Sequence, residues 1–88
     1  MTRVHVRVRG RVQGVFFRVE AQQRADSLGV AGWIRNADDG SVEAVFEGPE
    51  ERVESMLDWC RRGPAGARVE EVDAVGEAPA GEAGFRVL

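Results

Sequence analysis

The chain has 88 residues and a net charge of −3; 43% of its residues are hydrophobic and 31% are charged. This composition excludes an intrinsically disordered chain, and the length predicts one domain, residues 1–88, with a modest core of its own. No apolar run approaches the ~20 residues of a membrane-spanning helix, so we expect no membrane association.

Rare and missing residue types narrow the chemistry. All 12 basic residues are arginine, which excludes a Schiff-base lysine and the lysine of a phosphate loop. The one histidine, His5, cannot supply a histidine-rich zinc site, and we expect neither a metal nor a cofactor. The one cysteine, Cys60, excludes an internal disulfide, and no apolar signal segment follows Met1, so we expect a cytoplasmic protein.

Charge is distributed unevenly along the chain. Residues 1–18 contain five arginines and no acid, so the remaining residues carry a net charge of −8. A positive region on an acidic protein attracts small anions more readily than it binds a polyanion. We therefore expect a small anionic partner and no nucleic acid.

The N-terminal segment is predicted to be a strand. Val4, Val6 and Val8 alternate with polar residues, which is typical of a strand with one buried face. His5 falls on the polar side with no partner in register, and we interpret it as an ordinary sheet-face histidine. The alternation ends at Gly10, where a segment with two glycines begins.

A helix is predicted to follow, from Phe16 or Phe17 to Leu28. Gly29 is placed as its C-terminal stop, because glycine readily adopts the left-handed conformation that ends many helices. The helix has one narrow apolar stripe, formed by Phe17, Ala21, Ala25 and Leu28.

Residues 31–36 and 41–48 are predicted to form two strands of a hairpin. Asp39-Gly40 between them is a strong turn signal, since glycine accepts a positive φ and aspartate tolerates one. In the second of these strands apolar residues occupy one face, and Glu43 and Glu47 occupy the other.

A second helix is predicted between Pro49, which suits a first turn, and Gly63-Pro64, which ends it. Its buried face follows helical spacing and consists of Val53, Met56, Leu57 and Cys60. We interpret Cys60 as a small core residue and not as a nucleophile, because a buried thiol away from positive charge stays protonated. Further strands are predicted around residues 68–75 and, after a loop, over residues 85–88.

This order of elements predicts an α+β fold. It is the ferredoxin-like βαββαβ arrangement, with two helices packed on one face of an antiparallel sheet and a short extra strand at the C-terminus. In this arrangement the first and third strands are central, and the strand that ends at Asn36 runs beside the third. Fold alone does not indicate function, because this fold supports many functions.

The connection between the first strand and the first helix is one candidate site. It contains Gly10 and Gly14 and leads directly into a helix N-terminus. Backbone N–H groups of such a loop bind phosphate together with the positive end of the helix dipole. Arg18 is locally unfavourable in the first helical turn, but its guanidinium can donate paired hydrogen bonds to phosphate oxygens. A glycine-rich connection with a solvated arginine explains the same residues equally well.

Asn36, which ends a strand just before the hairpin turn, is a second candidate. Its amide offers both a donor and an acceptor. Asparagine near a turn is more often a turn former than a site residue, and the sequence leaves its distance from the loop open. Asp38 and Asp39 are better explained by the turn than as nucleophiles.

Both segments resemble the acylphosphatase family. Residues 10–18, Gly-Arg-Val-Gln-Gly-Val-Phe-Phe-Arg, match its signature G-x-V-Q-G-V-x-F-R, and residues 32–36, Gly-Trp-Ile-Arg-Asn, match its second motif. The resemblance covers essentially the whole chain, including the start of the second helix and its Gly63-Pro64 stop. Relatives often carry a hydroxyl residue after the asparagine, whereas this chain has Ala37, so any help from that hydroxyl is absent.

The resemblance implies a role for each of these residues. Asn36 would hold the attacking water. Arg18 would bind the phosphoryl group together with backbone N–H groups of the loop, those of Gln13, Gly14, Val15, Phe16, Phe17 and Arg18 itself. The protein would hydrolyse the carboxyl-phosphate bond of acyl phosphates as a cytoplasmic monomer without a metal, with inorganic phosphate as product and competitive inhibitor. Acyl phosphates have a good leaving group, so positioning and charge stabilisation are the main requirements.

Other functions compete with this one. A covalent cysteine phosphatase is excluded because Cys60 lies outside the loop. RNA-binding modules of this fold stack bases on aromatic residues of the sheet, whereas Phe16 and Phe17 lie at the loop–helix junction. The alternative that remains is a non-catalytic module for phosphate or carbamoyl phosphate, similar to domains of larger hydrogenase-maturation proteins. Retention of Arg18 with Asn36 favours catalysis, since binding alone does not require a residue that orients water.

Overall fold

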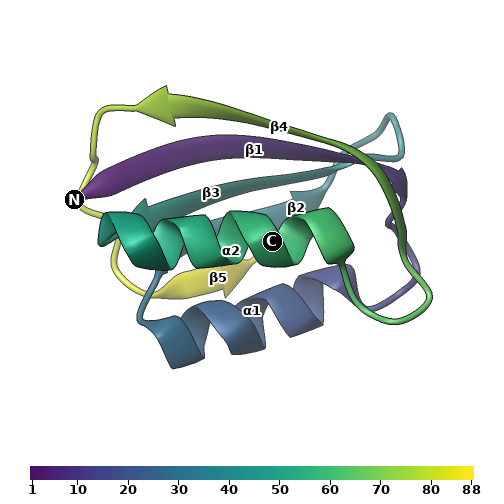
Figure 1. Ribbon diagram of the computed structural model, residues 1–88, viewed down its shortest axis with the longest axis horizontal. Coiled ribbons are helices and arrows are strands. Elements are labelled where there is room, and N and C mark those ends of the chain that lie inside the picture. Colours follow the sequence, from purple (N-terminus) through teal and green to yellow (C-terminus); the bar gives the residue numbers. More distant parts are fainter.

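In the computed structural model, which describes residues 1–88, the elements follow in the order predicted (Figure 1). They are β1 (Thr2–Arg11), α1 (Phe17–Leu28), β2 (Ala31–Asn36), β3 (Val42–Gly48), α2 (Glu50–Arg62), β4 (Arg68–Glu77) and β5 (Phe85–Val87). Both helices end at the expected glycines, Gly29 and Gly63, whose φ angles are 69° and 70°. Neither helix is long and apolar enough to cross a membrane.

The strands form one sheet in the order β4-β1-β3-β2-β5. The four longer strands pair antiparallel, and β1 and β3 occupy the central positions among them, as predicted. The short β5 adds to β2 in parallel orientation, so the complete sheet is mixed. Residues 78–84 therefore carry the chain from one edge of the sheet to the other.

β1 continues through Gly10, where the sequence predicts its end, because a β-bulge accommodates the glycine. The pairing of β1 with β4 shifts register between Arg9 and Gly10. Gly10 has a φ of 129°, and a Cβ atom there would lie 2.1 Å from the carbonyl oxygen of Arg68. Only glycine fits this position, one residue before the end of β1.

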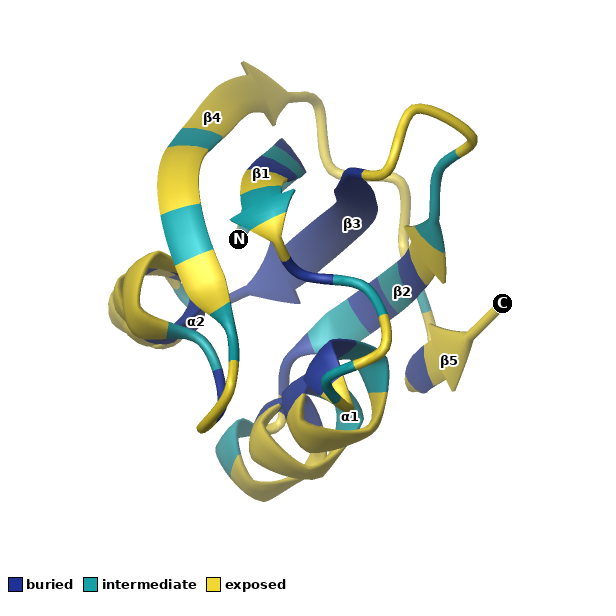
Figure 2. Cartoon of the chain, turned by 90° about the vertical axis from the view of Figure 1, so that its right-hand side faces the viewer, coloured by how far each residue is buried: buried dark blue, intermediate teal, exposed yellow.

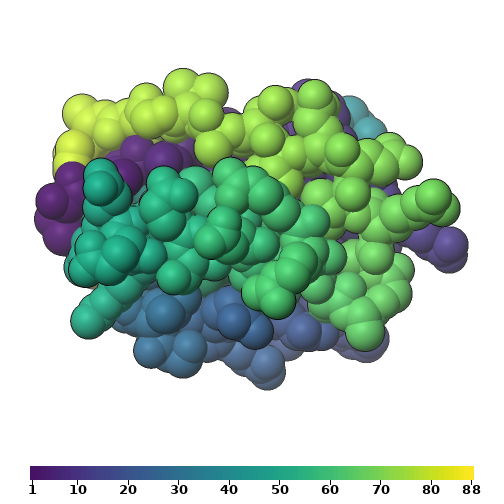
Figure 3. Space-filling model, viewed as in Figure 1, coloured from purple at the N-terminus to yellow at the C-terminus, as the bar shows by residue number.

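The core lies between the sheet and the two helices, which cover the same face (Figure 1). α1 packs against β2 and β5, and α2 packs mainly against β1 and β4. From the helix side, the space-filling view shows α2 across the middle of the molecule, with α1 along one margin and β4 along the other (Figure 3). The predicted stripes are buried, apart from the half-buried Leu28, and two aromatic residues that periodicity did not indicate join them, Trp59 and Phe85.

Strand direction brings the two candidate segments to the same end of the sheet. β1 and β2 are both antiparallel to β3, so they run in the same direction and end at the same edge. Val42 of β3 pairs with Val8 on one side and with Asn36 on the other, so the last part of β1 and the end of β2 lie level across β3. Figure 2 looks onto this end of the molecule, where the loop from β1 enters α1 and β2 leads into its hairpin.

Candidate active site

The loop between β1 and α1 turns through two residues in the left-handed conformation. Gly14 has a φ of 77°, and Phe16, the N-cap of α1, has a φ of 61° and a ψ of 23°. No side chain caps the helix at Phe16, so the backbone N–H groups of its first turn are left for another acceptor. Uncapped N–H groups and the positive end of the helix dipole form an anion-binding arrangement.

Arg18 lies in the first turn of α1 and is the charged side chain of this region. Its Nη1 atom donates a hydrogen bond to the carbonyl oxygen of Leu88 at 3.1 Å. Phe17, the preceding residue, is buried and packs its ring against Trp59 of α2 at a centroid distance of 5.0 Å. The start of α1 is thus fixed to the core on one side while Arg18 extends along the other.

Asn36 is held near the loop by the side chain of Gln13. The Gln13 amide donates hydrogen bonds to the carbonyl oxygens of Ala37 at 2.8 Å and of Ser41 at 2.9 Å. Both acceptors belong to the hairpin that follows Asn36, and the Ala37 N–H group bonds Ser41 across its base at 2.8 Å. The loop and the hairpin are therefore joined directly, next to the residue at the end of β2.

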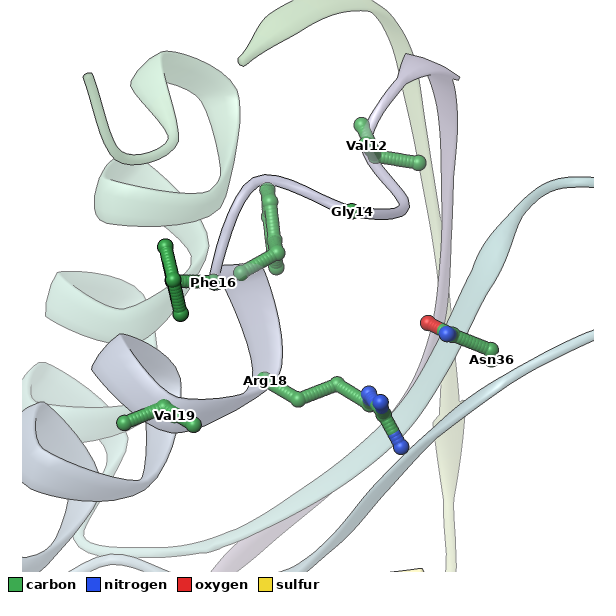
Figure 4. Close-up of a pocket in the computed structure, with 7 residues that line it drawn as sticks. Val12, Gly14, Phe16, Arg18, Val19 and Asn36 are labelled. Atoms are coloured by element: carbon green, nitrogen blue, oxygen red, sulfur yellow. The ribbon is translucent and has the colours of Figure 1, made fainter. Parts of the chain in front are cut away.

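A cavity of about 330 Å³ lies where these segments meet (Figure 4). Figure 4 shows the Arg18 guanidinium and the Asn36 amide extending toward the same region, with the Gly14 turn beside them. The lining residues are Val12, Gly14, Phe16, Phe17, Arg18, Val19 and Asn36.

Five of the seven residues expected at the site line the cavity. Gly14, Phe16, Phe17, Arg18 and Asn36 line the cavity. Gln13 and Val15 do not: the Gln13 side chain turns to the hairpin, and Val15 is half-buried against the core. Val12 and Val19 line the cavity but were not expected there. The sequence does distinguish Val19, which follows Arg18 directly and falls outside the predicted apolar stripe of its helix.

The cavity favours an anion. Arg18 is the one ionisable residue in its lining, and no carboxylate is among the other members. Asp39 of the adjacent hairpin is engaged elsewhere: the hydroxyl and N–H groups of Ser41 hold the pKa of its carboxyl down at about 2. Arg7 and Arg9 also lie within ion-pair distance of that carboxylate, at 3.6 and 3.4 Å.

The other face of the sheet carries a network of charged side chains. Burial opposes ionisation of Glu43, but hydrogen bonds from His5 and Arg35 outweigh it and lower the pKa of this carboxyl. The expectation that His5 lacks a partner was wrong. Its directly paired residue is Val45, and Glu43 lies diagonally across on the same face, within reach of a long side chain.

Cys60 lies in the core and not at the cavity. It is fully buried in α2, and burial raises the pKa of its thiol to about 12. The thiol is therefore protonated, as expected of a packing residue. No group of three or more histidine, cysteine, aspartate or glutamate side chains is arranged to hold a metal ion.

Known proteins resemble this chain over its full length. The family model described as Acylphosphatase matches residues 4–87. The chain is 54% identical over 85 residues to an acylphosphatase of Natronomonas pharaonis, covering 97% of this chain and 92% of that protein. It is 53% identical over 89 residues to an acylphosphatase of Roseiflexus sp., covering 100% and 96%. Among solved structures, an acylphosphatase from Bacillus subtilis has a TM-score of 0.97 at 35% identity, covering 100% of this chain and 99% of that one.

Proposed function

This chain belongs to the acylphosphatase family and hydrolyses acyl phosphates, and we propose that Arg18 and Asn36 carry out the reaction. The observation that carries the proposal is a single cavity lined by an arginine, the uncapped start of a helix and an asparagine. The first two groups suit a phosphoryl group, and the third suits a water molecule.

Arg18 and the loop bind the phosphoryl group. The guanidinium donates to two phosphate oxygens, and the backbone N–H groups of residues 13–18 donate the remaining hydrogen bonds to the phosphoryl group. In a loose phosphoryl-transfer transition state the charge lies on the equatorial oxygens, which are the atoms these donors address. The packing of Phe17 against Trp59 and the hydrogen bonds of Gln13 hold the loop in place, so its N–H groups need little reorganisation as the charge develops.

A water molecule held by Asn36 attacks the phosphorus atom. The water oxygen forms a bond to phosphorus, and the bond from phosphorus to the acyl oxygen breaks. The electron pair of the broken bond leaves with the carboxylate. An amide accepts no proton near neutral pH, so Asn36 orients the water and a phosphate oxygen takes the proton. Hydrolysis proceeds without a strong base because the carboxylate is a good leaving group.

Heavy-oxygen water tests the direction of attack. When benzoyl phosphate is hydrolysed in it, we expect the label in inorganic phosphate and none in benzoate. Label in benzoate would mean attack at the carbonyl carbon and would contradict the proposal. The spontaneous reaction without protein is the control.

Inhibition by inorganic phosphate separates the two roles. We expect competitive inhibition, with an inhibition constant raised at least about tenfold by Arg18→Gln and little changed by Asn36→Ala. Arg62→Gln, an exposed arginine at the end of α2, is the matched control. Protein that binds phosphate with the expected pattern but hydrolyses nothing would support the non-catalytic binding module instead.

We also propose that residues 1–88 act as one domain and as a monomer in the cytoplasm, without nucleic acid, metal or cofactor. Acidic residues outweigh basic ones after residue 18, which disfavours a polyanion as partner. Light scattering checks the oligomeric state, for which we expect the monomer mass of 9.6 kDa. A mass of twice this value or more would contradict it.

A further inference from the structure

We infer that Phe16 and Val19 form the acyl-binding side of the cavity and make this protein selective for acyl phosphates with an apolar, aromatic acyl group. The inference rests on the proposed function, in which Arg18 and the loop amides hold the phosphoryl group. It adds the part of the substrate that the proposed chemistry leaves unspecified.

The two side chains are apolar and exposed at the cavity. Phe16 is 76% exposed and Val19 is 48% exposed, and both line the cavity together with Arg18. They stand three residues apart at the start of α1, and Figure 4 shows both on the same side of Arg18. Their apolar surface therefore lies next to the phosphoryl-binding groups.

Phe16 is not explained by the stability of the fold. Its φ of 61° is the one positive value among the non-glycine residues of the chain, in a region that favours glycine and asparagine. A mostly exposed aromatic ring gains little from burial at that position. A bulky residue that costs stability in this way, at the edge of a substrate cavity, suits a role in contacting substrate.

The direction of the reaction brings the acyl group to these residues. The attacking water and the leaving oxygen lie roughly in line on opposite sides of phosphorus. Figure 4 shows Asn36 on one side of the cavity and Phe16 and Val19 on the opposite side, with Arg18 between them. A water held by Asn36 therefore drives the leaving carboxylate, with its substituent, toward Phe16 and Val19.

The chemistry of this side selects an apolar substituent. Phe16 and Val19 offer no charge or hydrogen-bonding group, and an aromatic ring gains contact area and ring packing against Phe16. An acetyl group is too small to cover either side chain. A charged acyl group would find no charged or hydrogen-bonding partner on these two side chains.

The test compares kcat/KM for benzoyl phosphate and acetyl phosphate within each variant, so that a general loss of loop function cancels in the ratio. We expect the wild type to favour benzoyl phosphate by at least about tenfold. Phe16→Asn, chosen because asparagine tolerates a positive φ, lowers the ratio about tenfold, and Val19→Ser lowers it about threefold. Val75→Ser, at a valine 63% exposed on β4, is the matched control and keeps the wild-type ratio.

Asn36→Ala, measured alongside, separates the inference from the mechanism. We expect it to slow both substrates and to keep their ratio, because the water is common to both. If it stays fully active, the proposed mechanism fails and the inference fails with it. If it is slow while Phe16→Asn and Val19→Ser both keep the wild-type ratio, the mechanism stands and the acyl-binding role is wrong.

Discussion

Gln13 illustrates how a single side chain can organise a site without contacting the reacting atoms. The resemblance to the family suggests its backbone N–H group as a phosphate ligand, whereas its side chain joins the loop to the hairpin after Asn36. The acceptors are backbone carbonyls of Ala37 and Ser41, and every residue has a carbonyl. No sequence pattern could have indicated this contact, whereas residue types and positions made Arg18 and Asn36 candidates, for which the family resemblance implies their roles.

Replacing this side chain tests its positioning role. We expect Gln13→Ala to lower kcat/KM by roughly tenfold or more, since a small misplacement of the water-holding residue is costly. Gln22→Ala is the matched control, because its amide also donates to a backbone carbonyl, that of Phe85 at 3.3 Å, away from the cavity. Equal effects of the two substitutions on kcat/KM would indicate a merely structural role.

The residue types of the cavity also determine the pH dependence of turnover. No aspartate, glutamate, histidine or cysteine lines it, and an arginine side chain is charged throughout the neutral range. We therefore expect kcat for benzoyl phosphate to be flat between about pH 5.5 and about pH 8. A bell-shaped profile in a stopped assay would reveal a general acid or base that the proposed mechanism lacks.

At the level of elements, local signals predicted both helices and the hairpin because each depends on neighbouring residues. Glycine stops, apolar spacing and the Asp39-Gly40 turn are all read within a few positions. The bulge at Gly10 and the parallel pairing of β5 depend on partners far along the chain. The sequence left the distance between the loop and Asn36 open for the same reason, because that distance depends on the pairing of β1 and β2 with β3.

Substitution of Gly10 tests the role of the bulge. A methyl group at Gly10 would collide with the backbone of β4, so we expect Gly10→Ala to lower the free energy of unfolding by about 3 kcal/mol and to weaken phosphate binding. Gly76→Ala is the control, because a Cβ atom there meets nothing within 4 Å. Urea unfolding measures both, and a Gly10→Ala variant as stable as the control would contradict the role of the bulge.

Across the whole molecule, the polar face of the sheet is stabilised by carboxylates that have lost most of their contact with water. Glu47 is 3% exposed, and its oxygens accept hydrogen bonds from the N–H groups of Ala80, Gly81 and Glu82 at 2.9 to 3.0 Å. Arg3 adds an ion pair at 3.2 Å. These contacts secure the segment that crosses from β4 to β5, and the alternation of β3 predicted the face of Glu47 but not its partners.

Because of these contacts, the stability of the fold depends on pH in the acidic range. The N–H group of Ala80 lowers the pKa of Glu47, burial opposes the shift, and Arg3 reinforces it. The carboxylate therefore stabilises the fold fully above the ordinary glutamate pKa of about 4.3 and loses this effect as the pH falls toward the lower folded pKa.

Thermal unfolding measures this contribution. We expect Glu47→Gln to lower Tm by roughly 5 °C or more near neutral pH, with the difference from wild type shrinking below about pH 4.5. Glu54→Gln, an exposed glutamate of α2, is the control and shifts Tm little. A Glu47→Gln deficit that stayed constant down to about pH 2 would mean that the charge is not what matters.

Hydrolysis of benzoyl phosphate in excess EDTA shows whether Arg18 and Asn36 carry out the reaction without a metal. We expect the wild type to remain fully active and kcat/KM to fall at least about 100-fold in Arg18→Gln and in Asn36→Ala, equivalent to about 2.7 kcal/mol of lost transition-state stabilisation. Circular dichroism confirms that each variant is folded. Loss of wild-type activity in EDTA, or a folded variant that keeps wild-type kcat/KM, would contradict a metal-free reaction carried out by Arg18 and Asn36.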